Sequence, residues 1–160
     1  MGETPLHWAA KNGHFEICKL IMSNIKNKNP RNNHGVTPLH WAARNGHFEV
    51  CQYIIANVTD KNPADEDGFT PLHMAASNGH SKICQILIEN AKDKNPKNSS
   101  GETPLQWAVG NGHFEVCQLI LENVSEGNSD LTPKTFDNGV LVFDLWMCGC
   151  VIYDFLTHFF

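Results

Sequence analysis

The feature that most constrains this chain is a phrase that recurs at a fixed step of 33 residues. It reads GETPLHWAAKNGHFEIC from Gly2, GVTPLHWAARNGHFEVC from Gly35, GFTPLHMAASNGHSKIC from Gly68 and GETPLQWAVGNGHFEVC from Gly101. A constant period of this length is typical of stacked repeat arrays, in which each unit packs against its neighbours. The period therefore favours a solenoid, and with it a protein that presents a surface.

The first half of each phrase predicts a helix of about two turns. Threonine is a favourable N-cap, and the proline after it stands where a helix needs no N–H. Leucine and two alanines then form an apolar stripe at helical spacing. A glycine, such as Gly13, ends the helix in a left-handed conformation. The residues of this motif are Thr4, Pro5, Leu6 and His7; Thr37, Pro38, Leu39 and His40; Thr70, Pro71, Leu72 and His73; and Thr103, Pro104 and Leu105.

The second half predicts another helix, followed by an extended polar finger. In the first copy, an apolar stripe at helical spacing runs from His14 to Met22. Asparagine at Asn24 suits the helix end, and the Asn29-Pro30 dipeptide marks a turn that leads to the next glycine. A single unit cannot bury both helices, so we expect stability to come from stacking.

These phrases closely resemble the ankyrin repeat. The pattern Gly-x-Thr-Pro-Leu-His-x-Ala-Ala-x-x-Gly-His is complete in the first three copies, whereas the fourth has Gln106 and Val109 in place of histidine and alanine. The resemblance covers residues 2–124 and implies an all-α ankyrin solenoid. Its four repeats would span about 2–34, 35–67, 68–100 and 101–124, the last reaching 133 on a wider bound. One departure is lysine at a normally apolar finger position: Lys28, Lys61 and Lys94.

Histidine and cysteine are the residue types that could carry chemistry here. His14 and Cys18 stand four residues apart on one predicted helix, and equivalent pairs recur in the later copies. A structural zinc site needs four ligands, whereas this pattern gives one separated pair per repeat. No third group accompanies a pair to orient it for nucleophilic catalysis. The resemblance implies that these histidines are structural. We therefore expect no enzyme, metal, cofactor or small-molecule substrate.

The net charge limits the class of partner, and the placement of the cysteines indicates the cellular compartment. The net charge is −5, and no basic track suits nucleic acid. Met1 runs straight into the first phrase, without a secretory signal. The first copy lacks a preceding finger and a polar outer cap, which suggests a fragment of a longer array or a short isoform. Equivalent helices should lie about 8–10 Å apart, too far for a disulfide with its limit of about 7 Å. We therefore expect free thiols and an intracellular monomer, cytoplasmic or alternatively nuclear. The thiols concerned are Cys18, Cys51, Cys84 and Cys117.

The resemblance implies a non-catalytic adaptor or scaffold that binds another protein on its concave face. In ankyrin proteins that face is formed by the fingertips and the exposed side of each first helix. The copies differ most at these positions, as a tuned surface and neutral drift both predict. The expected fingertip contacts are Asn33, His34 and Val36; Glu66, Asp67 and Phe69; and Ser99, Ser100 and Glu102. The expected helix contacts are Lys11, Arg44, Ser77 and Gly110, with Asn45, Asn78 and Asn111 after the last three.

Two further apolar features belong to this surface. Trp8, Trp41, Met74 and Trp107 form a row, one per first helix, either half-buried between helices or partly exposed as an anchor for a partner. Phe69 is the best single candidate for a binding hot spot. We expect Phe69→Ala to weaken partner binding without lowering the melting temperature.

Residues 125–160 break the period and leave several alternatives open. They could form a degenerate capping repeat, or a tail that arises from alternative splicing or a gene-prediction error. They could also associate with a membrane, aided by acylation of Cys148 or Cys150. The charge-free run 145–153 is far shorter than the ~20 residues of a membrane helix. The alternative function is accordingly a membrane-associated ankyrin protein, in which the tail sets location and the repeats recruit a partner.

Overall fold

The computed structural model describes residues 2–125 of the 160-residue chain. Within that range the chain forms α-helices and no strand. The first helices of the repeats are α1 (Pro5–Lys11), α3 (Pro38–Arg44), α5 (Pro71–Ser77) and α7 (Pro104–Gly110). The second helices are α2 (Phe15–Asn24), α4 (Phe48–Asn57), α6 (Ser81–Asn90) and α8 (Phe114–Ser125). The predictions of a capping repeat or a membrane anchor at 126–160 lie outside the described residues.

Each first helix begins and ends at the residues that the motif supplies. Thr70 is an extended N-cap whose hydroxyl accepts a hydrogen bond from the His73 N–H, and Pro71 follows at the first helical position. After the helix, Gly79 has a φ of 73°, in the left-handed region that favours glycine. The same order of cap, proline and glycine recurs in every repeat. These signals set a helix of only seven residues.

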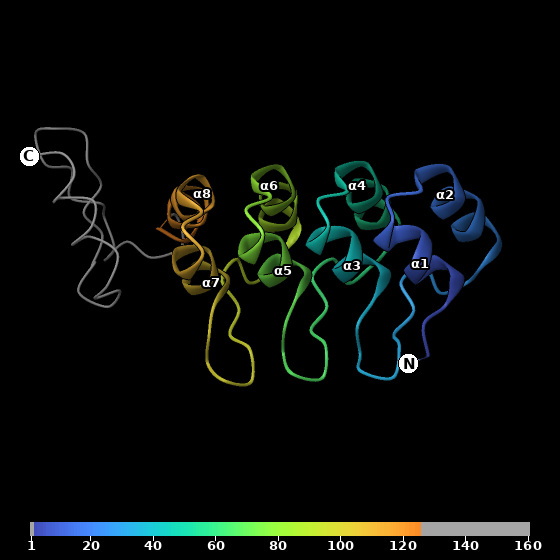
Figure 1. Cartoon of the computed structure of the whole chain (residues 1–160), viewed down its shortest axis with the longest axis horizontal. Coiled ribbons are helices and arrows are strands. Elements are labelled where there is room, and N and C mark those ends of the chain that lie inside the picture. Colours follow the sequence, from blue (N-terminus) through green and yellow to red (C-terminus); the bar gives the residue numbers. More distant parts are fainter. Residues whose placement is uncertain (1, 126–160) are drawn as a thin grey trace, which may run out of the picture.

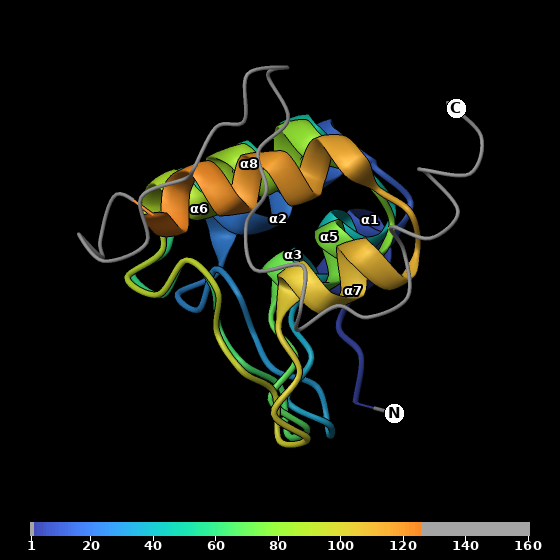
Figure 2. The ribbon, with the colours of Figure 1, turned by 90° about the vertical axis from the view of Figure 1, so that its left-hand side faces the viewer.

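The helices form two rows that run the length of the array (Figure 1). The first helices α1, α3, α5 and α7 pack side by side in one row, and α2, α4, α6 and α8 pack in the other. The view along the array shows the two rows as separate layers, with the fingers extending from one side (Figure 2). This arrangement confirms the all-α solenoid expected from the repeat. Among the described residues, no helix combines the length and apolar character needed to cross a membrane.

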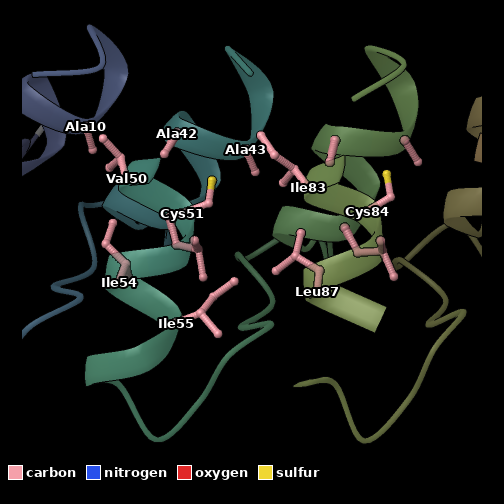
Figure 3. Close-up of a cluster of buried hydrophobic side chains, with 14 of the residues drawn as sticks. Ala10, Ala42, Ala43, Val50, Cys51, Ile54, Ile55, Ile83, Cys84 and Leu87 are labelled. Carbon is pink, nitrogen blue, oxygen red and sulfur yellow. The ribbon is translucent and has the colours of Figure 1, made fainter. Parts of the chain in front are cut away.

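The hydrophobic core runs through the interfaces between repeats. Figure 3 shows Val50 of α4 pointing toward Ala10 of the preceding repeat, and Ile83 of α6 pointing in the same way toward Ala43. All four side chains are buried. Because alanine is small, the branched side chain of the next repeat can approach the first helix closely. Each repeat therefore completes the core of its neighbour.

The fingers between repeats have a common internal structure. At each tip an Asn or Asp accepts two backbone N–H bonds through its Oδ1 atom; Asp65, for example, accepts from Asp67 at 3.1 Å and Phe69 at 2.8 Å. Asn32 and Asn98 do the same in the other two fingers. The unexpected finger lysines also find partners. Lys28 donates to the Met22 carbonyl, and Lys61 donates to the Asn90 side chain.

Candidate partner-binding surface

The histidines of the Thr-Pro-Leu-His motif join each repeat to the next finger. The His40 Nδ1 atom accepts from the Thr37 backbone N–H at 3.1 Å, so it carries no proton. The proton is therefore on Nε2, which donates to the Phe69 carbonyl of the following finger at 3.0 Å. His7 and His73 make equivalent bonds to the Val36 and Glu102 carbonyls. These imidazoles act as neutral cross-links.

Burial favours the neutral form of His40 and His73. Desolvation lowers the pKa of His40 to about 4, although its bond to the Phe69 carbonyl opposes the shift. The pKa of His73 is lowered for the same reason. A second proton, on Nδ1, would also remove the acceptor of the hydrogen bond from the Thr37 N–H. A base that is already hydrogen-bonded at both nitrogens and buried has no free position for substrate or metal.

The histidines of the Gly-His motif make the reverse link, back to the preceding repeat. His47, His80 and His113 donate from Nε2 to the carbonyls of Lys11, Arg44 and Ser77, at 3.0–3.1 Å. His47 also packs against Gly13, where an added Cβ would lie 2.5 Å from its Nδ1 atom. The motif glycine therefore has two roles, a left-handed backbone and close contact with the next repeat.

The thiols of the second helices are buried packing groups. Cys18, Cys51 and Cys84 are fully buried, and no disulfide occurs in the described part of the chain. Burial raises the pKa of Cys18 to about 11 and that of Cys84 to about 12, and it raises the pKa of Cys51 further. Since the thiolate is the nucleophile, these side chains are chemically inert at neutral pH. Within residues 2–125, no three histidine, cysteine or acidic side chains gather as metal ligands would.

The predicted fingertip residues form one row along the lower edge of the array in Figure 1. The tips are tied together by backbone bonds, from the Glu66 N–H to the His34 carbonyl at 3.1 Å and from the Ser99 N–H to the Asp67 carbonyl at 2.9 Å. The side chains of these four residues remain exposed, as do those of Asn33 and Ser100. The row is thus held by its backbone, with the variable side chains left for solvent or a partner. Val36, Phe69 and Glu102 are half-buried beside it.

The predicted first-helix residues differ in solvent exposure and in the hydrogen bonds of their side chains. Arg44 and Gly110 are exposed, and Lys11 and Ser77 are half-buried. The asparagines that follow are exposed, but their amides are engaged with backbone carbonyls: Asn45 with Lys11, Asn78 with Met74, and Asn111 with Trp107. These asparagines therefore support the helix ends, and the residue before each of them is better placed to meet a partner.

Phe69 connects the fingertip row to the first-helix row. Its ring lies edge-on to His73 at 5.6 Å and to Trp107 at 5.7 Å between ring centroids. The two rows therefore border one surface, which we call the inner surface: Lys11, Arg44, Ser77 and Gly110 with the exposed fingertip residues. Because Phe69 also packs between repeats, an alanine there combines a packing effect with any binding effect. Lys11, Arg44, Glu66 and Asp67 are cleaner positions to test.

Sequence reasoning missed the structural roles of two sets of side chains that shape this surface. Asn29, Asn62 and Asn95 were expected only as turn formers, but each Oδ1 accepts from the backbone N–H at Leu39, Leu72 or Leu105, in the next first helix. The tip residues Asn32, Asp65 and Asn98 were not singled out at all. Both sets recur at the 33-residue period, and that recurrence is the signal that could have found them.

Comparison with known families agrees with this geometry. A family model described as ankyrin repeats, in three copies, matches residues 1–65 and 54–133. The chain belongs to the ankyrin-repeat family. Ankyrin repeats are in general protein-interaction modules, and the family is generally non-catalytic. A search of curated proteins found no match.

Proposed function

We propose that this ankyrin array is a non-catalytic adaptor that binds another protein on its inner surface. The observation that carries the proposal is that recurring and variable side chains of each repeat have different roles. The recurring side chains, such as His40 and His47, form hydrogen bonds between repeats. The side chains that differ between copies, such as Arg44 and Asp67, are exposed along one connected surface. Exposed positions that vary above a recurring framework are what a surface selected for a particular partner would have.

The array acts in this proposal as an intracellular, cytoplasmic monomer. Its buried thiols support a reducing compartment, because they are free cysteines in a chain that repeats them at one position. No catalytic step is assigned to the array. The recurring bonds of the framework hold the inner surface in one shape, so binding would cost little ordering of the array itself.

Affinity capture with two matched variants of the full chain tests this function. The inner variant combines Lys11→Ala, Arg44→Ala, Glu66→Ala and Asp67→Ala. The outer variant removes the same number of cations and acids from the second helices, at Lys19, Lys82, Glu49 and Glu89, all of them exposed. We expect wild type and the outer variant to capture the same partner from a lysate, and the inner variant to lose it. Loss in the outer variant with capture intact in the inner one would place binding on the second helices and contradict the proposal.

A further inference from the structure

Two tryptophans and two cations form a continuous row across the first two repeats. The Lys11 Nζ atom lies 5.1 Å from the Trp8 ring centroid and 4.5 Å from that of Trp41. The Arg44 guanidinium lies 5.7 Å from the Trp41 ring centroid. The order along the array is thus Trp8, Lys11, Trp41, Arg44, which we call the cation–indole row. Each contact is within the distance at which an aromatic face attracts a cation.

The row is confined to one end of the inner surface. The equivalent positions in the third repeat are Met74 and Ser77, and in the fourth they are Trp107 and Gly110. The framework of all four repeats is the same, so folding alone does not require a cation after the tryptophan. The repeats therefore differ in what they offer a partner, and the positive charge is placed at α1 and α3.

The two cations of the row have no acidic partner in the described part of the chain. The ion pair found there joins His34 and Glu66 at 4.0 Å, between fingertips. Lys11 and Arg44 lie over indole rings, although the chain as a whole carries a net charge of −5. An aromatic face orients a cation without neutralising it. Lys11 and Arg44 therefore stay charged and can pair with a carboxylate. Arginine can hold one through two parallel hydrogen bonds.

Trp8 adds an apolar contact beside this charge. Its side chain is 52% exposed, whereas Trp41 and Trp107 are half-buried with their indole N–H groups covered. Tryptophan and arginine are the residue types most enriched at the centres of protein interfaces, where a ring excludes water from a neighbouring ion pair. The exposed indole of Trp8 lies beside Lys11, in a row that continues to Arg44, so the row combines both elements of such a centre.

We propose that the cation–indole row binds an acidic segment of the partner protein. Its carboxylates pair with Lys11 and Arg44, and an apolar side chain next to them covers Trp8. This inference rests on the proposed function, since it names the class of partner that the inner surface selects. Because the whole chain is acidic, general electrostatics oppose such a partner, and only a local site would favour it.

Two labelled peptides of about twelve residues test the inference on the full chain. One alternates glutamate with leucine and phenylalanine, and its twin has lysine in place of each glutamate. Fluorescence anisotropy should show the glutamate peptide binding at least tenfold more tightly, with an affinity that falls as salt rises from about 0.05 to 0.3 M. Equal affinities, or a preference for the lysine twin, would overturn the inference.

Charge reversal identifies the site. Lys11→Glu with Arg44→Glu should abolish the preference for the glutamate peptide, and Trp8→Ala should weaken binding of that peptide at least threefold. The control, Lys19→Glu with Lys82→Glu, changes the net charge equally at exposed positions of α2 and α6. An equal loss in that control would show general electrostatics and contradict the site. Arg44→Glu alone, with circular dichroism to confirm folding, serves if the double variant is unstable.

Two further arms separate this inference from other outcomes. A single-stranded oligonucleotide and vesicles containing phosphatidylserine carry anionic groups of another class, and tighter binding of either through Lys11 and Arg44 would overturn the acidic-segment proposal. Capture of the natural partner, unchanged by the double reversal but lost in the inner variant, would refute the row while the adaptor function stands. If all of these variants still capture the partner, the result contradicts both the adaptor proposal and the acidic-segment proposal.

Discussion

The first and third repeats carry nearly the same phrase in different surroundings. Ile17 of α2 and Ile83 of α6 are the same residue at the same position, yet Ile17 is 49% exposed and Ile83 only 2%. Ile83 points toward Ala43 of the preceding repeat, whereas among the described residues no helix comes before α1. The comparison shows that burial is supplied by the neighbour and is not a property of the repeat alone. Stability is therefore a sum of interfaces.

The largest effect expected from this comparison is on the free energy of unfolding. Ile83→Ala should lower it by about 3 kcal/mol, because the substitution leaves a cavity inside a filled interface. Ile17→Ala should lower it by about 1 kcal/mol, because half of that side chain is already in water. Urea unfolding of the two variants measures the difference. Equal losses would mean that the interface with the preceding repeat does not set the burial.

Acid should weaken the interfaces through their buried histidines. In the unfolded chain the His40 pKa is near 6.5, and in the folded chain burial lowers it to about 4. Between these values only the unfolded chain binds the proton, so the free energy of unfolding falls as the pH drops, by roughly 2–3 kcal/mol for this group. Below about pH 4 both states are protonated and the contribution levels off. The lowered pKa of His73 adds to the same loss.

Urea unfolding at several pH values checks this prediction. His40→Gln is the matched variant, because Gln106 already stands at the equivalent position and accepts from the Thr103 N–H at 2.8 Å. That variant should unfold with a shallower dependence between pH 6.5 and 4. An unchanged slope would show that His40 does not carry the acid sensitivity.

The motif glycines give a smaller contrast between Gly13, which the second repeat covers, and Gly112 of the fourth repeat. Gly13 and Gly112 have φ values of 71° and 73°, so alanine strains both backbones alike. A Cβ at Gly13 would also clash with the His47 ring, whereas one at Gly112 meets no atom of the described residues within 4 Å. We expect Gly112→Ala to cost about 1 kcal/mol and Gly13→Ala about 2 kcal/mol. Thermal melting that ranks them in the opposite order would contradict the packing role of His47.

The smallest expected effect separates the framework of a finger from its surface. Asn62 accepts from the Leu72 N–H at 3.0 Å, so Asn62→Ala should cost about 1 kcal/mol by leaving that group unpaired. Asn33 is exposed at the tip, and Asn33→Ala should leave stability unchanged within about 0.5 kcal/mol. A comparable loss in both would mean that the tip side chains also support the fold.

The architecture could be predicted from the sequence because its signals are local. Threonine, proline and glycine act on the backbone within a few residues, and the period repeats them without slippage. The period also implied contacts between repeats, but it could not say which atoms meet. The bond from His40 to the Phe69 carbonyl joins residues 29 apart, and its geometry depends on the finger conformation.

The candidate site could be predicted only in outline. The fingertip and first-helix positions came from the resemblance, and the structure shows which of them are exposed. The commitment of the Asn45, Asn78 and Asn111 amides to backbone carbonyls was not visible in the sequence. Nor was the placing of Lys11 between Trp8 and Trp41, because those tryptophans are brought together only by the stacking of α1 on α3.

Hydrogen–deuterium exchange of the full chain, alone and with its captured partner, tests the central claim most directly. The adaptor account predicts slower exchange on binding in α1, α3 and the fingertips near residues 33–36 and 65–69, with little change in α2, α4 and α6. The first helices and the tips border the inner surface, whereas the second helices form the outer row. Protection confined to the second helices, with unchanged exchange in α1, α3 and the tips, would contradict the account.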